Sequence, residues 1–240
     1  MKKVVSFFTA VLMLLTAFPL TVFAENSGEI FYSVISEEEK TCKITGVDSN
    51  ARELIIPAEL DGYKVIAIGR EAFCDCEFEK INLPNTLEYI GRYAFYYCQN
   101  LSSIIIPNSV TYIDDHAFEN CPLSYVFIPS GVITIEAEAF GYYHTYTATE
   151  KMYDFAIIGV KGSAAEAYAQ ANEFKFLLFG DVHTDSNVNA VDARWVLQAA
   201  AGLRALQFDS WRIADVNQDG VINSVDARWV LQTGAGMRTF

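Results

Sequence analysis

The chain has 240 residues, of which 30 are acidic and 17 are basic, so its formal net charge is −13. This length allows one or two domains. An acidic surface without a basic cluster repels both nucleic acid and anionic lipid, so we expect neither as a partner.

The first 24 residues have the pattern of an export signal. Lys2 and Lys3 provide the basic start, and residues 4–24 carry no charge. The small Ala24 supplies a cleavage point. The alternative is a membrane anchor, because the uncharged run could almost span a bilayer. Pro19 and Ala24 favour cleavage, so we expect a secreted, extracellular protein that is not held in a membrane.

Residues 25–179 contain a repeat. Ala-Phe pairs recur at intervals of 22, 23 and 22 residues, and an apolar-x-apolar-Pro segment precedes each pair. The pairs are 72–73, 94–95, 117–118 and 139–140, and the segments end at Pro57, Pro84, Pro107 and Pro129. Alternating apolar residues on a short strand face one side. Because one unit cannot bury that side alone, the pattern predicts a β-rich solenoid of four stacked units.

The five cysteines fit the repeat better than they fit disulfides. Cys76, Cys98 and Cys121 each lie three residues after a repeat phenylalanine, which predicts a ladder of buried thiols. Cys42 and Cys74 lie outside this pattern. A bond from Cys74 to Cys42 or Cys76 has no support from the spacing.

Both ends of the solenoid differ from its middle, as caps do. Residues 31–45 have the pattern of a capping hairpin. At the other end, Ser163 and Glu166 have the spacing of a capping box, which predicts a helix to about Ala171, followed by a strand over residues 174–179.

Two segments interrupt the repeat pattern. Five extra residues in the first unit contain Asp61-Gly62, a turn signal. The tyrosine-rich segment 141–153 follows the last unit, where Tyr143 replaces the expected cysteine. That segment is either an aromatic contact surface for a glycan or protein, or a β-hairpin whose tyrosines cover the end of the stack. The hairpin is the favoured interpretation.

The joint recurrence of Pro, Ala-Phe and Cys resembles the BspA-like leucine-rich repeats of bacterial surface proteins. This resemblance implies that the repeats bind a protein, a cell-surface component or a polysaccharide.

The last sixty residues contain one segment twice, because residues 181–198 recur at 215–232. Oxygen-bearing side chains stand at loop positions 1, 3, 5, 9 and 12, the EF-hand-like spacing for calcium. The expected ligands are Asp181, Asp185, Asn187, Asn189 and Asp192 in loop one, and Asp215, Asn217, Asp219, Val221, Asn223 and Asp226 in loop two. Asn187 and Val221, at loop position 7, are expected to bind through their carbonyl oxygens. In loop one, His183 replaces an amide ligand and Ser186 replaces the turn glycine. We therefore expect two calcium ions, the first bound more weakly.

Each loop leads into a helix, expected over residues 191–201 and 225–233, but no helical pattern precedes loop one. That absence disfavours a helix-loop-helix calcium sensor. The paired units over residues 180–240 resemble a type I dockerin. The predicted fold is thus multidomain, with a β-rich leucine-rich-repeat solenoid followed by a small α-helical dockerin.

The dockerin resemblance implies calcium-dependent binding to a cohesin module of a scaffoldin, in a cellulosome that takes part in polysaccharide catabolism. It also implies contacts in two nearly equivalent sets. They are Ala190, Val191, Leu197 and Gln198, and Ser224, Val225, Leu231 and Gln232.

No catalytic constellation is recognisable in the sequence. The histidines are His116, His144 and His183, and none forms a zinc-binding pair by spacing. We therefore expect a protein that is not an enzyme. The alternative is a carbohydrate-active enzyme with an unrecognised pair of carboxylates in the repeats or in residues 141–153.

Overall fold

The structure, a computed structural model, describes residues 20–24, 28–48, 52–145, 147–206 and 208–237. The chain divides into two compact units, the first comprising residues 1–126 and 131–155, and the second residues 127–130 and 156–240. The second unit thus contains both the last strands of the repeat region and the predicted calcium loops. No helix among the described residues is long and apolar enough to cross a membrane.

The first unit begins with the predicted capping hairpin. Strand β2 (Gly28–Ser36) pairs antiparallel with β3 (Thr41–Asp48), which confirms the expectation. Strand β1 (Leu20–Ala24) pairs antiparallel with β2. These five residues lie in the predicted export signal, and the rest of that segment, residues 1–19, lies outside the described residues. Cleavage after Ala24 would leave β2 as the edge strand.

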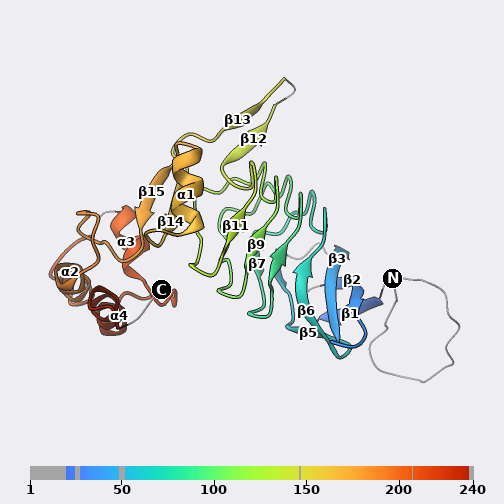
Figure 1. The fold of residues 1–240 in the computed structure, drawn as a ribbon, viewed down its shortest axis with the longest axis horizontal. Helices are drawn as coiled ribbons and strands as arrows, with labels where there is room; N and C mark the ends of the chain where they lie inside the picture. The colour runs from blue at the N-terminus through green and yellow to red at the C-terminus, as the bar shows by residue number, and fades with distance from the viewer. Residues whose placement is uncertain (1–19, 25–27, 49–51, 146, 207, 238–240) are drawn as a thin grey trace, which may run out of the picture. The chain divides into compact units, whose positions relative to one another are not determined.

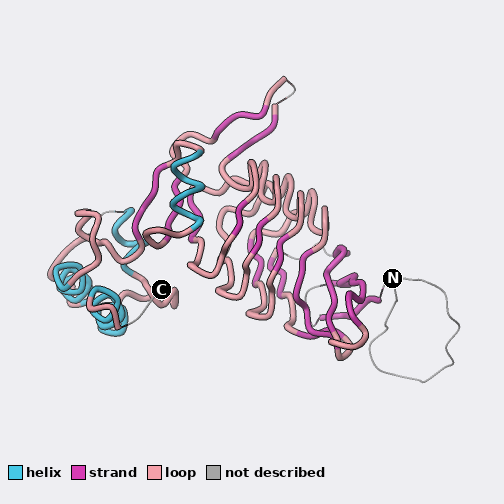
Figure 2. The backbone as a smooth tube through the Cα atoms, viewed as in Figure 1, coloured by secondary structure: helices cyan, strands magenta, loops and turns pink. Residues whose placement is uncertain are grey.

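One short strand from each repeat joins a parallel ladder. Its members are β6 (Tyr63–Ile68), β8 (Tyr89–Ile90), β9 (Tyr112–Ile113) and β11 (Thr134–Ile135). Figure 1 shows these strands side by side, each displaced by one turn of the solenoid. The apolar-x-apolar-Pro segments give a second, shorter set, in which β4 (Glu53–Ile55) pairs parallel with β7 (Lys80–Asn82). Most of each repeat is loop, as Figure 2 shows.

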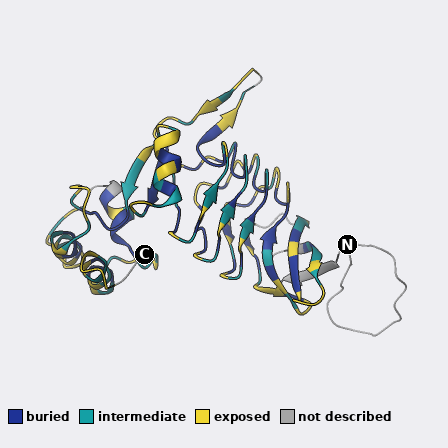
Figure 3. Cartoon of the chain, viewed as in Figure 1, coloured by how far each residue is buried: buried dark blue, intermediate teal, exposed yellow. Residues whose placement is uncertain are grey.

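The core of the first unit is a column of phenylalanine rings. Phe73, Phe95, Phe118 and Phe140 are the Ala-Phe residues of successive turns, and all are buried. Their ring centroids are 5.1, 4.7 and 4.6 Å apart. In Figure 3 the buried positions follow the inner side of every turn. Stacked aromatic rings at this spacing contribute beyond their buried area, so this column fixes the register between turns.

The thiol ladder runs beside the ring column. The Cys98 thiol donates a hydrogen bond to the Phe73 carbonyl, and the Cys121 thiol donates one to the Phe95 carbonyl, each over 3.0 Å. Both cysteines are buried, while Cys76 is half-buried. All five cysteines are free. The predicted ladder is therefore confirmed for Cys98 and Cys121, and each thiol is a second donor to a carbonyl that already accepts a backbone N–H, from Cys76 or Cys98.

Each turn of the solenoid makes a corner through left-handed backbone. The residue before Ala-Phe has a positive φ in every repeat, for which the values are 55° at Glu71, 54° at Tyr93, 56° at His116 and 55° at Glu138. Backbone hydrogen bonds link equivalent corners, since Phe95 N–H donates to Ala117 and Phe118 N–H donates to Ala139. Side chains at this corner position therefore stack along the solenoid.

The interruptions also take the expected forms. Asp61 and Gly62, both with positive φ, form the turn between β5 (Glu59–Leu60) and β6. In the 141–153 segment, β12 (Tyr142–His144) pairs antiparallel with β13 (Thr149–Lys151), which confirms the hairpin. The idea that its tyrosines cover the stack is only partly right, because Tyr142 is 8% exposed but Tyr153 is 99% exposed.

The second unit begins with a parallel strand pair. The pair belongs to a three-stranded sheet in the order β10-β14-β15, and of β10 (Tyr125–Phe127) only Phe127 is assigned to this unit. In it, β14 (Ala156–Gly159) and β15 (Lys175–Leu178) are parallel, and α1 (Ala164–Ala171) connects them. Helix and final strand lie where the sequence predicted them.

The capping box predicted for α1 is wrong. The Ser163 side chain makes no cap hydrogen bond. The Glu166 carboxylate instead accepts the Gly162 N–H over 2.6 Å. Gly162 has a φ of 78°. Its N–H therefore replaces the N–H of Ser163, the donor that a capping box would use.

Three helices follow β15 in the part of the chain that the structure describes. Helices α2 (Ala190–Ala200) and α4 (Ser224–Gly234) are the two that the sequence predicted, and they pack against each other. Gly234 permits this close approach, since a Cβ there would lie 2.8 Å from both the Asn189 Cα and the Val188 oxygen. Helix α3 (Phe208–Ala214), which leads into loop two, was not predicted.

Candidate metal centre

Loop two folds around two buried carboxylates, Asp215 and Asp226, which are 8% and 0% exposed. Asp215 accepts the N–H groups of Asp219 and Gly220, over 3.2 and 2.9 Å. Asp226 accepts the N–H of Asn217 over 3.3 Å, and that of Asn223 over 2.9 Å. Each carboxylate is thus held by two backbone donors at fixed places in the loop, which positions the expected first and last ligands.

Loop one repeats this arrangement 34 residues earlier. Asp181 accepts the N–H groups of Asp185 and Ser186, over 3.1 and 2.7 Å. Asp192 accepts the N–H of His183 over 3.1 Å, and that of Asn189 over 2.9 Å. Asp181 is 5% exposed and Asp192 is fully buried. The repeated sequence therefore gives a repeated backbone, even where the side chains differ.

The turn residue differs between the loops but not in conformation. Gly220 has a φ of 84°, and Ser186, its equivalent, has a φ of 67°. Glycine adopts this conformation without a steric cost, whereas serine does so under strain. Loop one therefore holds the same shape at a higher conformational cost.

The amides at loop position 9 have a role that the sequence analysis did not predict. Asn189 and Asn223 are the N-caps of α2 and α4, and each accepts the N–H of the residue two further on over 2.7 Å. Asp192 and Asp226 complete a capping box in each helix. The loop and the helix that follows it are therefore one hydrogen-bonded unit.

The two loops differ in the side chain at loop position 3, which is Asn217 in loop two and His183 in loop one. Asn217 in loop two donates its side-chain N–H to Asp219 over 2.7 Å. In loop one, the His183 imidazole lies between two carboxylates, with Nδ1 2.7 Å from Asp192 and Nε2 2.9 Å from Asp185. The hydrogen bond to Asp192 raises the pKa of His183 above its ordinary value. An imidazole here competes with a hard cation for the same oxygens.

The donor set and its electrostatics fit calcium. Burial raises the pKa of both Asp181 and Asp215 above the ordinary value for a carboxyl, and neighbouring carboxylates in each loop raise it further. Two buried carboxylates and an exposed one, Asp185 or Asp219, share each small loop, and they repel one another unless a cation lies among them. Loop two, which offers only oxygen ligands, fits this ion better than loop one.

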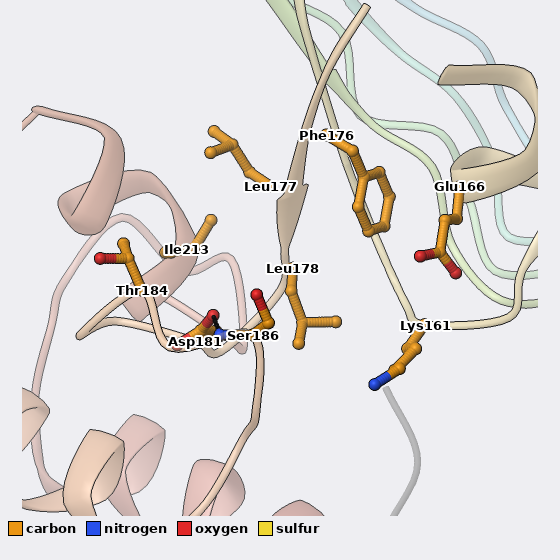
Figure 4. Close-up of a pocket in the computed structure, with 9 residues that line it drawn as sticks. All are labelled: Lys161, Glu166, Phe176, Leu177, Leu178, Asp181, Thr184, Ser186 and Ile213. Atoms are coloured by element: carbon orange, nitrogen blue, oxygen red, sulfur yellow. Dashed lines mark hydrogen bonds between the residues drawn. The ribbon is translucent and has the colours of Figure 1, made fainter. Parts of the chain in front are cut away.

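A hollow of about 330 Å³ lies beside loop one, near β15. Figure 4 shows the residues that line it. Lys161 and Glu166 lie on the other side of β15 from Thr184 of the loop. The carboxylates of Glu166 and Asp181 both accept backbone N–H groups. Both carboxylates are thus positioned by backbone donors.

The eight residues that the dockerin resemblance assigned to cohesin contact lie at the start and middle of α2 and α4. Leu197 and Leu231 are 48% and 46% exposed. Ala190 and Ser224 are exposed, and the remaining four, Val191, Gln198, Val225 and Gln232, are half-exposed. By contrast Val196 and Val230, one position earlier than the leucines, are fully buried. The helices thus present two equivalent sets of accessible side chains.

Comparison with known families finds two separate matches in the chain. The sequence profile of BspA type leucine rich repeat regions matches residues 64–159 with six copies, and that of type I dockerin domains matches residues 179–233. The solenoid accordingly has about six turns rather than four. The profile extends from β6 to β14, so it includes the end strands, where the Ala-Phe and Pro pattern is incomplete.

Several crystal structures of repeat proteins are similar to this chain. A leucine-rich repeat protein from Bacteroides capillosus shares 26% identity, with a TM-score of 0.43, over 48% of this chain and 87% of that one. A leucine rich repeat protein from T. pallidum shares 20% identity, with a TM-score of 0.43, over 57% and 70%. A leucine rich cell surface protein from Faecalibacterium prausnitzii shares 21%, with a TM-score of 0.40, over 59% and 45%.

A comparison with curated protein sequences finds no match. Type I dockerin domains bind calcium, in agreement with the loops described above. The chain thus contains a region, residues 64–159, that matches BspA type leucine rich repeats, followed by a C-terminal region, residues 179–233, that matches type I dockerin domains.

Proposed function

We propose that this protein is a secreted, non-catalytic component of a cellulosome. Its dockerin domain, residues 180–240, binds a cohesin module of a scaffoldin in a calcium-dependent way. Its repeats, residues 25–179, hold a protein, a cell-surface component or a polysaccharide close to the site of polysaccharide breakdown. Residues 1–24 direct export and are removed.

The observation that carries this proposal is the equivalence of the two loop-helix units. Each places one exposed leucine, Leu197 or Leu231, on a helix whose first turn is hydrogen-bonded to a carboxylate-rich loop. A half-exposed leucine beside small and polar side chains is typical of a protein contact surface. Because the two sets are nearly the same, a cohesin can be bound through either of them.

Calcium acts on this surface through the capping boxes. Asp192 and Asp226 belong to the expected ion ligands and also accept the N–H groups of Asn189 and Asn223 at the helix starts. An ion in each loop would therefore fix the start of α2 or α4, and with it Val191 or Val225. Binding of a metal to such a small domain contributes directly to its folding free energy.

The test is a calorimetric titration of the exported chain with a panel of cohesin modules, in calcium and in chelator. We expect binding to at least one cohesin, and only in calcium. The double variant Leu197→Glu/Leu231→Glu should abolish binding. Leu203→Glu is the matched control, because Leu203 is 81% exposed but outside the predicted sets. Binding that survives the double variant, or that L203E abolishes, would contradict the proposal.

The role of the repeats is tested with the same full-length protein. Soluble and insoluble plant polysaccharides are incubated with the protein, and both retention and the release of reducing sugar are measured. Retention without release supports a binding module. Release of reducing sugar in proportion to the amount of purified protein would contradict the non-catalytic assignment and favour an enzyme.

A further inference from the structure

The solenoid brings together three side chains that lie far apart in the sequence. His116 and Glu138 occupy the same left-handed corner position in adjacent turns, just before Ala-Phe. Backbone hydrogen bonds between these turns, from His116 to Ala137 and from Phe118 to Ala139, hold the two corners in register. Glu119 lies one residue after Phe118, on the same corner as His116. Stacking of the turns therefore creates a cluster that no local motif predicts.

The distances in this cluster are those of metal ligands. His116 Nδ1 lies 3.0 Å from a Glu119 carboxylate oxygen and 3.3 Å from a Glu138 carboxylate oxygen. The three donor atoms all lie within 4.8 Å of one another. Ligands about 2.0–2.1 Å from a tetrahedral ion are about 3.4 Å apart, so the observed separations match the edges of such a tetrahedron.

These contacts are not hydrogen bonds. His116 Nδ1 is buried and has no hydrogen-bond partner among the described residues, although two carboxylate oxygens lie beside it. A ring nitrogen and two carboxylate oxygens that lie this close together, with no hydrogen bond to the ring nitrogen, form a donor set that a bound cation would complete.

Glu119 supplies an independent observation. The residue is only 2% exposed, and its second carboxylate oxygen, Oε1, is buried without a hydrogen-bond partner in the part of the chain described. A buried carboxylate oxygen that lacks a hydrogen-bond partner is costly, because it has given up its hydrogen bonds to water without a replacement. The nearest charged group to Oε1 that the structure records is His144 Nδ1, at 3.6 Å. A cation bound by Glu119 would remove this cost.

Neighbouring side chains restrain the cluster, and a hollow connects it to solvent. The Tyr93 ring stacks on His116, with centroids 4.8 Å apart and an interplanar angle of 13°, which restrains the imidazole. Asp115 lies 3.7 Å from His116 Nε2, the ring nitrogen that would not bind the ion. A hollow of about 290 Å³, lined in part by Glu119 and His144, gives access from solvent. Metal-binding histidines commonly have a carboxylate near their second nitrogen.

We propose that His116, Glu119 and Glu138 bind a Zn²⁺ ion on the solenoid, with His144 at the mouth of the site as the fourth ligand. An imidazole with two carboxylates suits zinc, whereas calcium prefers a larger set of oxygens. The site is separate from the calcium loops in residues and in donor type. It links the repeat that carries His116 to the next one and to the hairpin strand β12 that carries His144.

The experiment is a calorimetric titration of the calcium-saturated exported chain with Zn²⁺. The background variant His183→Asn removes the one histidine in the calcium loops, so that loop one cannot supply an imidazole to zinc. We expect one equivalent of Zn²⁺ to bind in this background. Replacement of zinc by Co²⁺ should give the visible absorption of a tetrahedral ion, a signal that a purely structural ion pair would not produce.

Two variants assign the ligands. Glu119→Gln and His116→Asn should each weaken zinc binding by at least about tenfold. Asparagine is chosen because it tolerates the left-handed backbone at this corner. Glu71→Gln is the matched control, since Glu71 occupies the same corner position two turns from His116 and lines the same hollow, but is not one of the three clustered ligands. It should bind zinc as the background protein does. Circular dichroism without zinc verifies that all variants fold.

The proposal is overturned if the H183N protein binds no zinc, or if E119Q and H116N bind it with unchanged affinity. Either result would mean that His116 is an ordinary charged partner of the two glutamates. Loss of binding in E71Q as well as in E119Q would also overturn it, because the effect would then be one of general surface charge.

Discussion

His183 Nδ1 lies 2.7 Å from the buried carboxylate of Asp192, the residue expected to close the ion shell of loop one. In loop two the equivalent of His183 is Asn217, which bonds to Asp219 through its side chain and leaves Asp226 to backbone donors. The two loops therefore share a backbone but differ in what surrounds their last ligand.

Replacing this histidine should improve loop one. In His183→Asn, an amide oxygen is restored and the imidazole no longer competes for Asp192 and Asp185. We expect the calcium affinity of loop one to rise by on the order of tenfold, about 1.4 kcal/mol. The reciprocal variant Asn217→His should weaken loop two by a similar factor. Calcium calorimetry measures both, and equal affinities in all three proteins would refute the explanation.

The contribution of the histidine should also depend on pH. The hydrogen bond to Asp192 raises the pKa of His183 in the folded, calcium-free loop. A raised histidine pKa stabilises the calcium-free fold below the ordinary pKa, and this stabilisation disappears as the pH rises through the folded value. Calcium must displace the protonated form, so its affinity for loop one should fall as the pH decreases through this raised pKa, a fall that begins above the ordinary histidine value of about 6.5. In H183N the fall should be absent over the same range, where calorimetry at several pH values can detect it.

The ring column predicts a large effect in the solenoid. Phe118 is 1% exposed, and its ring lies 4.7 and 4.6 Å from the rings of Phe95 and Phe140. Phe118→Ala would leave a cavity between two turns and should reduce the free energy of unfolding by about 3–5 kcal/mol. Ile133→Ala is the control, because Ile133 is 76% exposed and should change stability by less than about 0.5 kcal/mol. Denaturant unfolding followed by circular dichroism gives both values.

Thiol reactivity should follow the ladder. Cys74 is exposed, whereas Cys42, Cys98 and Cys121 are buried. Burial raises the pKa of Cys42 and of Cys76 to about 12, so both remain protonated near pH 8. Alkylation of the native protein should therefore label Cys74 first, and all five only after denaturation. Mass spectrometry of the labelled peptides would contradict the ladder if Cys98 or Cys121 reacted as fast as Cys74.

The sequence was most informative where a pattern recurs. The Ala-Phe interval gave the ring column, and the 34-residue offset gave α2 and α4 to within about one residue at most ends. Such features follow from local chemistry repeated in register. The count of solenoid turns was less accurate, because the end turns lack the full pattern.

Features that depend on three-dimensional arrangement were missed. Helix α3 has only seven residues, too few for a clear apolar period. Ser163 has the expected cap spacing, but Gly162 redirects the backbone and Glu166 bonds to it instead. His116 and Glu138 are separated by a full repeat in the sequence and meet only because the turns stack. Periodicity identifies columns of apolar residues, yet it does not show which polar side chains face each other between turns.

Removal of calcium should affect only one part of the protein. In chelator we expect the helical signal of residues 180–238 to be lost, because their buried carboxylates then repel one another and the small core cannot compensate. The strand signal and the cooperative melting of the solenoid should persist. A C-terminal transition that chelator leaves unchanged would contradict this coupling.

The most direct test of the account is calcium calorimetry on the chelator-treated exported chain, with Asp215→Ala/Asp226→Ala and Asp181→Ala/Asp192→Ala as the paired loop variants. We predict two binding events, the tighter one absent from the loop-two variant and the weaker one absent from the loop-one variant. No heat of binding in the parent protein, or the same heat in both variants as in the parent, would contradict the assignment of these loops as calcium sites.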